Sequence, residues 1–280
     1  MITAILRYLV CGFAAGVIAT SSAHATETSP WQTDTYSAIR LIAGEHFADA
    51  RWGAGIEIRL DPGWKTYWRY PGDSGVPPRF DFTQSTNVQS VKLLWPAPHR
   101  FTDESGNSIG YKDDVIFPIE ITPQDPQKPV TLRLALDYAV CEKLCVPAKG
   151  NAELAVSEAA IPTTGLALSA AAERVPKRAE VGDGATVGIR AVRRETQDGH
   201  DRVVVDVAAP AADPVELFAE GPTSDWALPL PEPVSAAPAG LRRFAFELDG
   251  LPPGAKADGA VLTFTLVAGD HALEVNAKLD

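Results

Sequence analysis

The chain reads as a succession of short, alternating apolar runs separated by turn residues. Ile56, Ile58 and Leu60 alternate with charged residues, which is the pattern of a strand with one face in a core. The 23 prolines and 22 glycines supply frequent turns, and the sequence has no long segment of helical periodicity. This combination predicts an all-β protein.

Each half of the chain has enough strands for its own sandwich. In the first half we expect about seven or eight strands, which is typical of an immunoglobulin-like β-sandwich. The second half predicts a second, smaller β-sandwich-like domain, in which the proline-rich segment 229–238 forms a loop. The expected strands cover 36–43, 56–60, 64–70, 91–95, 115–121, 130–138, 152–156, 187–192, 203–208, 215–219, 244–248, 261–267 and 272–279.

The N-terminus has the features of a secretory signal peptide. Arg7 is followed by a mostly apolar stretch without charge and by the small-x-small pattern Ala23-His24-Ala25. The apolar run is too short to span a bilayer, so we expect cleavage rather than anchoring, and export to a bacterial periplasm. The expected organisation is then a signal peptide (1–25), a first domain (26–157), a linker containing a short helix (158–186) and a second domain of unknown role (187–280).

Two cysteines, Cys141 and Cys145, are the only ones expected in the mature chain. Residues four apart on a straight strand lie about 13 Å apart, whereas a disulfide needs Cα atoms within about 7 Å. A disulfide between them therefore requires a bend, and Pro147 fits the end of a strand. Because so short a loop stabilises little, the pair suits an exchangeable redox site better than a structural staple. Metal binding is a third possibility.

Composition and motifs argue against other classes of function. A net charge of −11 with no basic run makes the chain a poor binder of nucleic acid or anionic membranes. The histidines are far apart in sequence and Met1 is the only methionine, so we expect no metal and no cofactor. The segment 106–110 matches the G-x-S-x-G hydrolase pattern, but we expect its flanks to be a polar loop and then a strand, whereas the motif requires a strand before it and a helix after it.

Four segments together resemble the N-terminal periplasmic domain of the DsbD/ScsB thiol:disulfide interchange proteins. They are Gly63-Trp64-Lys65-Thr66-Tyr67-Trp68-Arg69-Tyr70-Pro71-Gly72-Asp73-Ser74-Gly75, Leu94-Trp95-Pro96-Ala97-Pro98, Ser108-Ile109-Gly110-Tyr111-Lys112-Asp113 and Asp137-Tyr138-Ala139-Val140-Cys141-Glu142-Lys143-Leu144-Cys145-Val146-Pro147. The resemblance covers roughly residues 33 to 157. It implies an immunoglobulin-like sandwich whose two cysteines accept electrons from a membrane-embedded partner and reduce periplasmic thioredoxin-like proteins.

The resemblance also implies roles for individual residues. Cys141 and Cys145 match the family's redox pair, and Cys145 would form the mixed disulfide with a target. A loop that shields the disulfide should lie near 103–111. The candidate shielding side chains in and beside it are Phe101, Ile109 and Tyr111. Tyr138 either packs over the pair or fills the core.

One departure from the family concerns the rest of the relay. The sequence has no transmembrane domain and no C-terminal thioredoxin-like domain, so a separate membrane thiol:disulfide transporter would have to donate the electrons. The hypothesis is thus a periplasmic thiol–disulfide exchange protein, as a component of a protein-disulfide reductase. The alternatives are a non-enzymatic binding or assembly module with a structural disulfide, and a copper-handling protein.

Overall fold

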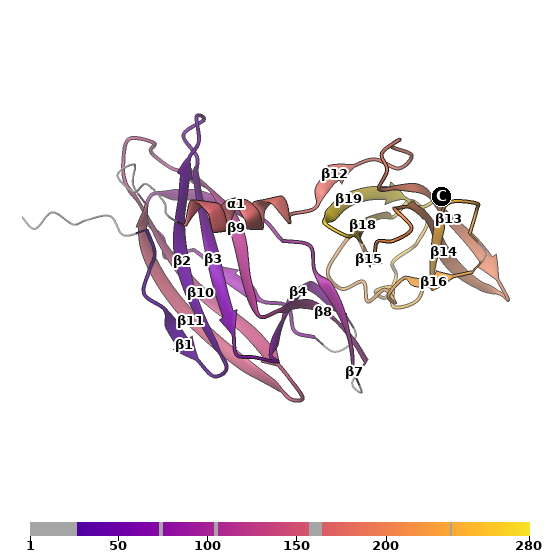
Figure 1. Ribbon diagram of the computed structural model, residues 1–280, viewed down its shortest axis with the longest axis horizontal. Helices are drawn as coiled ribbons and strands as arrows, with labels where there is room; N and C mark the ends of the chain where they lie inside the picture. Colours follow the sequence, from indigo (N-terminus) through magenta and orange to yellow (C-terminus); the bar gives the residue numbers. More distant parts are fainter. Residues whose placement is uncertain (1–26, 73–74, 104–105, 157–163, 236) are drawn as a thin grey trace, which may run out of the picture.

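The computed structural model describes residues 27–72, 75–103, 106–156, 164–235 and 237–280. It consists of two β-sandwiches that lie side by side, the larger N-terminal and the smaller C-terminal (Figure 1). The predicted all-β class is therefore confirmed. Within the described residues no helix has the length and apolar character needed to cross a membrane. The expected signal peptide lies outside these residues.

The N-terminal sandwich is built from two antiparallel sheets. One sheet has the order β1-β2-β3-β9-β6, and the other has the order β11-β10-β4-β8-β7, with β5 also paired to β10. The strands are β1 (Gln32–Asp34), β2 (Ser37–His46), β3 (Trp52–Leu60), β4 (Lys65–Gly72), β5 (Arg79–Asp81), β6 (Val88–Leu93), β7 (His99–Asp103), β8 (Gly106–Lys112), β9 (Asp114–Pro123), β10 (Val130–Cys141) and β11 (Cys145–Val156).

Alternation of side chains places the core between these two sheets. Ile56 and Ile58 on β3 are fully buried, and Leu132, Leu134 and Leu136 on β10 meet them from the opposite sheet as members of one hydrophobic core. Burying aliphatic side chains of this size contributes about 1.5–3 kcal/mol each. The two-residue period of the sequence thus sets which face of each strand lies inside.

The helix α1 (Gly165–Glu173) lies against the sheet that contains β2 and β9 (Figure 1). The hydroxyl of Thr164 donates to the carbonyl oxygen of Ala43 at 3.0 Å. Gly44 and Gly55 leave room for the helix, since a Cβ on either would lie 2.6 or 2.9 Å from a side-chain atom of Leu168. The short helix expected within 158–186 is therefore present, and it packs on the N-terminal sandwich.

The C-terminal sandwich has sheets of order β12-β19-β18-β15 and β13-β14-β17-β16. Its separate core includes Leu217, Phe246 and Phe264. The segment 229–238 was expected to be a loop, but it contains the short strand β16, whose backbone pairs with β17. The strands are β12 (Lys177–Ala179), β13 (Gly188–Gln197), β14 (His200–Ala208), β15 (Val215–Glu220), β16 (Glu232–Val234), β17 (Arg242–Glu247), β18 (Val261–Ala268) and β19 (His271–Lys278).

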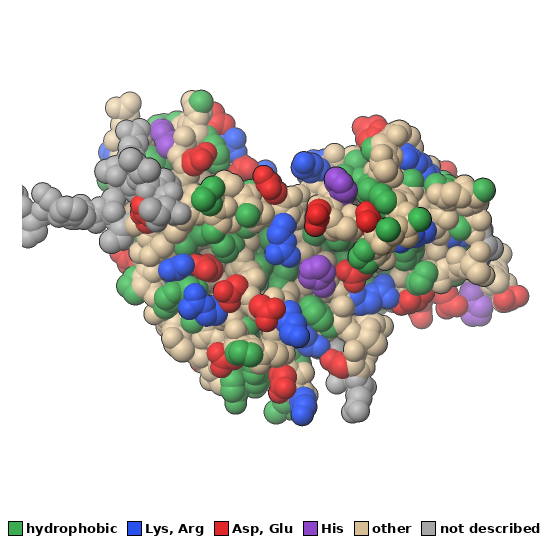
Figure 2. All heavy atoms as spheres, viewed as in Figure 1, with side chains coloured by type: hydrophobic (Ala, Val, Ile, Leu, Met, Phe, Trp, Pro, Cys, Tyr) green, Lys and Arg blue, Asp and Glu red, His purple; other side chains and the backbone are tan. Residues whose placement is uncertain are grey.

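The two sandwiches share a packed boundary. Phe218, Leu230 and Val267 belong to the C-terminal sandwich but cluster with the core of the N-terminal one. The ring of Trp68 lies 5.7 Å from that of Phe218, centroid to centroid. Acidic and basic side chains are interspersed on the face shown in Figure 2, including the region where the two lobes meet.

Candidate functional site

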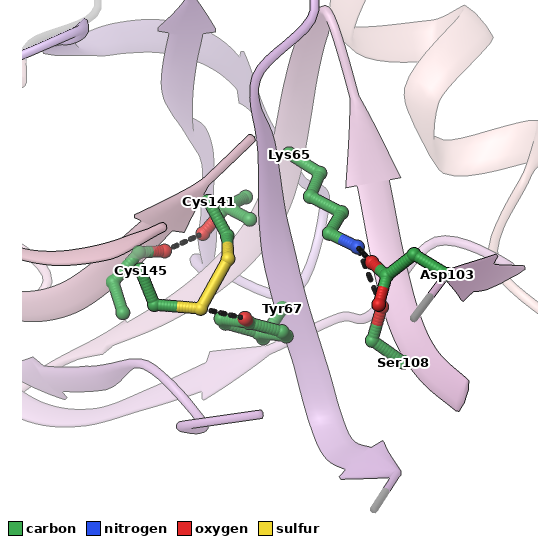
Figure 3. Close-up of a disulfide and its surroundings, with 8 residues drawn as sticks. Lys65, Tyr67, Asp103, Ser108, Cys141 and Cys145 are labelled. Carbon is green, nitrogen blue, oxygen red and sulfur yellow. Dashed lines mark hydrogen bonds and ion pairs between the residues drawn. A yellow bond between two sulfur atoms is a disulfide. The ribbon is translucent and has the colours of Figure 1, made fainter. Parts of the chain in front are cut away.

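The two cysteines form a disulfide at the tip of the β10–β11 hairpin. Cys141 is the last residue of β10 and Cys145 the first of β11, and their Cα atoms are 4.2 Å apart. The hairpin is paired along its length, from Val130 opposite Val156 to Cys141 opposite Cys145. The expected bend between the cysteines is therefore present, and the disulfide closes a hairpin that the backbone ladder already holds (Figure 3).

The two cysteines differ in exposure. Cys141 is only 6 % exposed and packs with Tyr67 and Ala139 in a small cluster of its own. Cys145 is exposed, and Leu144 beside it has 75 % of its surface in solvent. Cys145 is therefore the more exposed residue of the pair.

A buried tyrosine contacts the exposed cysteine. The Tyr67 hydroxyl, on β4, lies 3.0 Å from the Sγ of Cys145 (Figure 3). Burial, followed by the negative charge of Asp103, raises the pKa of Tyr67 above its ordinary value. The phenol consequently stays protonated at neutral pH and has a proton to donate to this sulfur.

Sequence reasoning did not single out Tyr67. It lies within the 63–75 run that carries the family resemblance, and it alternates with Trp68, which is fully buried in the main core. This alternation places Tyr67 on the opposite face of β4, the face that Ala139 and Cys141 share. The alternation of Tyr67 with Trp68 is visible in the sequence, but only the pairing of β4 with β10 shows that the Tyr67 face lies next to the cysteines.

Lys65 pairs with Cys141 in the β4–β10 register, yet its charge is already engaged. Its ammonium donates to Asp103 at 2.7 Å and to the hydroxyl of Ser108 at 3.0 Å (Figure 3). The ammonium also lies 5.7 Å from the ring centre of Phe101. Because Asp103 offsets the positive charge, Lys65 serves to join β4 to β7 and β8. Its effect on a nearby thiolate is correspondingly reduced.

The candidate shielding residues fall in different places. Ile109 and Tyr111 are buried in the main core, where the Tyr111 hydroxyl donates to the carbonyl oxygen of Pro96 at 2.8 Å. Tyr138 is also in that core, with its hydroxyl 2.7 Å from that of Ser37. Phe101 alone lies half-buried near the site, beside Lys65.

The loop expected at 103–111 is mostly strand, and this expectation needs correction. Within the described residues, β7 pairs with β8 from His99 opposite Gly110 to Asp103 opposite Gly106. The polar, glycine-rich composition concealed the strand, because small residues are needed where β8 meets β4. A Cβ on Gly110 would lie 1.9 Å from the carbonyl oxygen of Thr66. The G-x-S-x-G match therefore lies in a strand rather than at a strand–helix turn.

The remaining charges at the hairpin tip are solvated. Glu142 and Lys143 are exposed in the turn between the cysteines. Among the residues that the structure describes, no group of three or more histidine, cysteine, aspartate or glutamate side chains is arranged to hold a metal ion. The groups at the hairpin tip that can take part in thiol chemistry are the two sulfurs and the phenol of Tyr67.

A comparison with known families matches residues 38–157 to the family described as "Thiol:disulfide interchange protein DsbD, N-terminal". This segment is therefore similar to the DsbD N-terminal family. The match includes both cysteines and Tyr67, so the disulfide at the hairpin tip lies inside a domain of the thiol:disulfide interchange class.

The fold of the whole chain also has a solved counterpart. The chain is similar to the N-terminal periplasmic domain of ScsB from Proteus mirabilis, with a TM-score of 0.70 and 22 % sequence identity. The similarity covers 90 % of this chain and 98 % of that one, so it extends beyond the DsbD-type domain into the C-terminal sandwich. No curated protein sequence matches this chain.

Proposed function

We propose that this protein is a periplasmic dithiol/disulfide carrier, a component of a protein-disulfide reductase. The observation that carries the proposal is the asymmetric pair at the hairpin tip. Cys145 is exposed with a phenol at its sulfur, and Cys141 is buried behind it. This arrangement supplies one attacking sulfur and one resolving sulfur, as thiol–disulfide exchange requires.

The exchange proceeds in two steps that balance. In the reduced form, the Cys145 thiolate attacks one sulfur of a partner's disulfide, which forms a mixed disulfide and releases the partner's other sulfur as a thiolate. Cys141 then loses its proton and attacks the Cys145 Sγ, which breaks the mixed disulfide and restores the Cys141–Cys145 bond. Two electrons pass to the partner, whose two thiolates take up the proton released by Cys141 and one proton from the solvent, so that the partner leaves as a dithiol.

The similarity to the DsbD N-terminal family supports the classes of donor and acceptor that we propose. We propose that a membrane thiol:disulfide transporter reduces the pair, and that periplasmic thioredoxin-like proteins oxidise it again. The exposed Leu144, next to Cys145, offers an apolar contact to either partner. The family match and the fold shared with a periplasmic domain support this placement.

Trapping tests the roles of the two sulfurs. With Cys141→Ser, Cys145 can attack but nothing resolves the adduct, so a mixed disulfide with a thioredoxin-like protein should accumulate. Cys145→Ser should accumulate far less of it, because the remaining sulfur is buried. Equal trapping by both variants would refute the assigned roles. Absence of trapping, with unchanged partner redox states in cells, would refute the carrier function.

The reduction potential separates a carrier from a structural disulfide. A carrier should equilibrate between about −270 mV, the value for thioredoxin, and about −180 mV, the value for a disulfide isomerase. A potential well below about −300 mV, together with unfolding on reduction, would favour the binding or assembly module. Stoichiometric copper binding by the reduced protein would instead favour the metal-handling alternative.

A further inference from the structure

Strand β4 connects the disulfide to the boundary between the two sandwiches. Its first part, Lys65 to Tyr67, pairs with β8, and the pairing then shifts before it resumes at Gly72. Its pairing with β10 is confined to Lys65 and Thr66. Tyr67, which contacts Cys145, is therefore the last residue of the first β4–β8 ladder and lies one residue past the end of the β4–β10 ladder.

The next three residues of β4 all contact the C-terminal sandwich. Trp68 packs against the ring of Phe218. The guanidinium of Arg69 forms a two-pronged contact with Glu220 at 2.8 and 2.7 Å, and also donates to Glu274 at 2.7 Å. The hydroxyl of Tyr70 donates to the carbonyl oxygen of Leu228. The other sandwich thus supplies the contacts that the local ladder lacks.

Arg69 has the geometry of a fixed anchor. Its side chain is 26 % exposed, and those of Glu220 and Glu274 are 18 % and 22 % exposed. Although burial opposes its charge, the two carboxylates raise the pKa of Arg69 above its already high ordinary value. A planar guanidinium between two carboxylates holds its position more firmly than a single ion pair does.

We propose that the C-terminal sandwich is a working part of the redox site, and that Arg69 is the positioning residue through which it holds Tyr67 at Cys145. The inference rests on the proposed redox function, because the property at stake is the reactivity of the pair. It gives the second sandwich a role that its own sequence, without cysteines, does not suggest.

The test is the thiol–disulfide equilibrium of the full chain in glutathione buffers. Arg69→Gln removes both ion pairs, so Tyr67 should move away from the sulfur and the reduced form should lose stabilisation. We expect the equilibrium to shift toward the disulfide by about tenfold, which is about 30 mV for a two-electron couple. Arg69→Lys keeps the charge but loses the fork, and it should shift the equilibrium in the same direction by a smaller factor.

A double-mutant cycle separates positioning from loss of stability. In a Tyr67→Phe background the hydroxyl is already absent, so Arg69→Gln should cause no further shift. The matched control is Glu232→Gln. It removes the ion pair of Glu232 with Arg100, which also joins the two sandwiches but involves β7 rather than β4. It should leave the equilibrium unchanged.

Three results would overturn the inference. They are an unchanged equilibrium in both Arg69 variants, an equal shift with and without the Tyr67 hydroxyl, and an equal shift in the Glu232 control. If Arg69→Gln does not fold, Arg69→Lys and Glu274→Gln carry the same comparison. Failure of the proposed function looks different, because the wild-type protein would then not equilibrate with glutathione or dithiothreitol while folded.

Discussion

Replacing Tyr67 with phenylalanine isolates one hydroxyl at the sulfur that is expected to react. Phenylalanine keeps the ring packed against Ala139 and Cys141 and removes only the group 3.0 Å from Cys145 Sγ. A sulfur in a disulfide is a weak acceptor, whereas a thiolate accepts a charge-assisted hydrogen bond. The substitution therefore destabilises the reduced, ionised form more than the oxidised form.

The magnitude follows from the strength of such a bond. A hydrogen bond to a charged group contributes about 1.5–3 kcal/mol, and about 1.4 kcal/mol corresponds to 30 mV in a two-electron couple. Tyr67→Phe should thus make the potential more negative by about 30–60 mV when Cys145 is ionised. Because the Cys145 thiolate loses the same hydrogen bond in the reduced protein, its pKa should rise.

The assays are redox equilibration in glutathione buffers and titration of thiolate absorbance in the reduced protein. Tyr138→Phe is the matched control, since it removes a buried hydroxyl from β10 that contacts Ser37 on the core side. The control should lose about 1 kcal/mol of stability and keep the wild-type potential. A potential that is unchanged or less negative in Tyr67→Phe would refute the reasoning.

Three further predictions concern stability. Reducing the disulfide should lower the free energy of unfolding, measured by denaturant titration, by only about 2 kcal/mol, because its loop is short. A reduced protein that is already unfolded without denaturant would contradict this. Gly110→Ala places a Cβ against the Thr66 carbonyl and should cost about 3 kcal/mol, or roughly 6–12 °C in Tm, whereas Gly184→Ala, in open space, should cost little. Asp206 is buried between Arg243 and Arg193, which hold its pKa below the ordinary value. The ionised carboxylate therefore stabilises the fold above the unfolded pKa of about 4, and this contribution is lost as the pH falls through the folded pKa. Asp206→Asn should therefore cost about 2–3 kcal/mol at neutral pH, and the difference from wild type should vanish in acid; a difference that persists at low pH would contradict this.

Local patterns in the sequence predicted the parts of the fold that depend on local physics. The two-residue alternation of Leu132, Leu134 and Leu136 predicted a half-buried strand, because strand geometry alone sends alternate side chains to opposite faces. The spacing of Cys141 and Cys145 predicted a bend, because a disulfide cannot bridge a straight strand over that distance.

Contacts between distant segments were not predictable in this way. The strand at Gly106–Lys112 was not predicted because it lacks apolar alternation. Its close backbone contact with β4 requires small residues instead. Ile109 and Tyr111 were expected near the disulfide, and the register of β8 places them in the core instead. Sequence patterns do not encode such registers, which depend on long-range strand pairing.

The sequence by itself determined that this chain is a β protein with one closely spaced pair of thiols able to form a disulfide. Only the tertiary structure decided which sulfur is exposed, that Tyr67 is its neighbour, and that Arg69 ties the same strand to the C-terminal sandwich. The physical reason is that these properties belong to pairs of residues that are distant in sequence. Their distances are set by the pairing of strands and by the packing of one sandwich on the other.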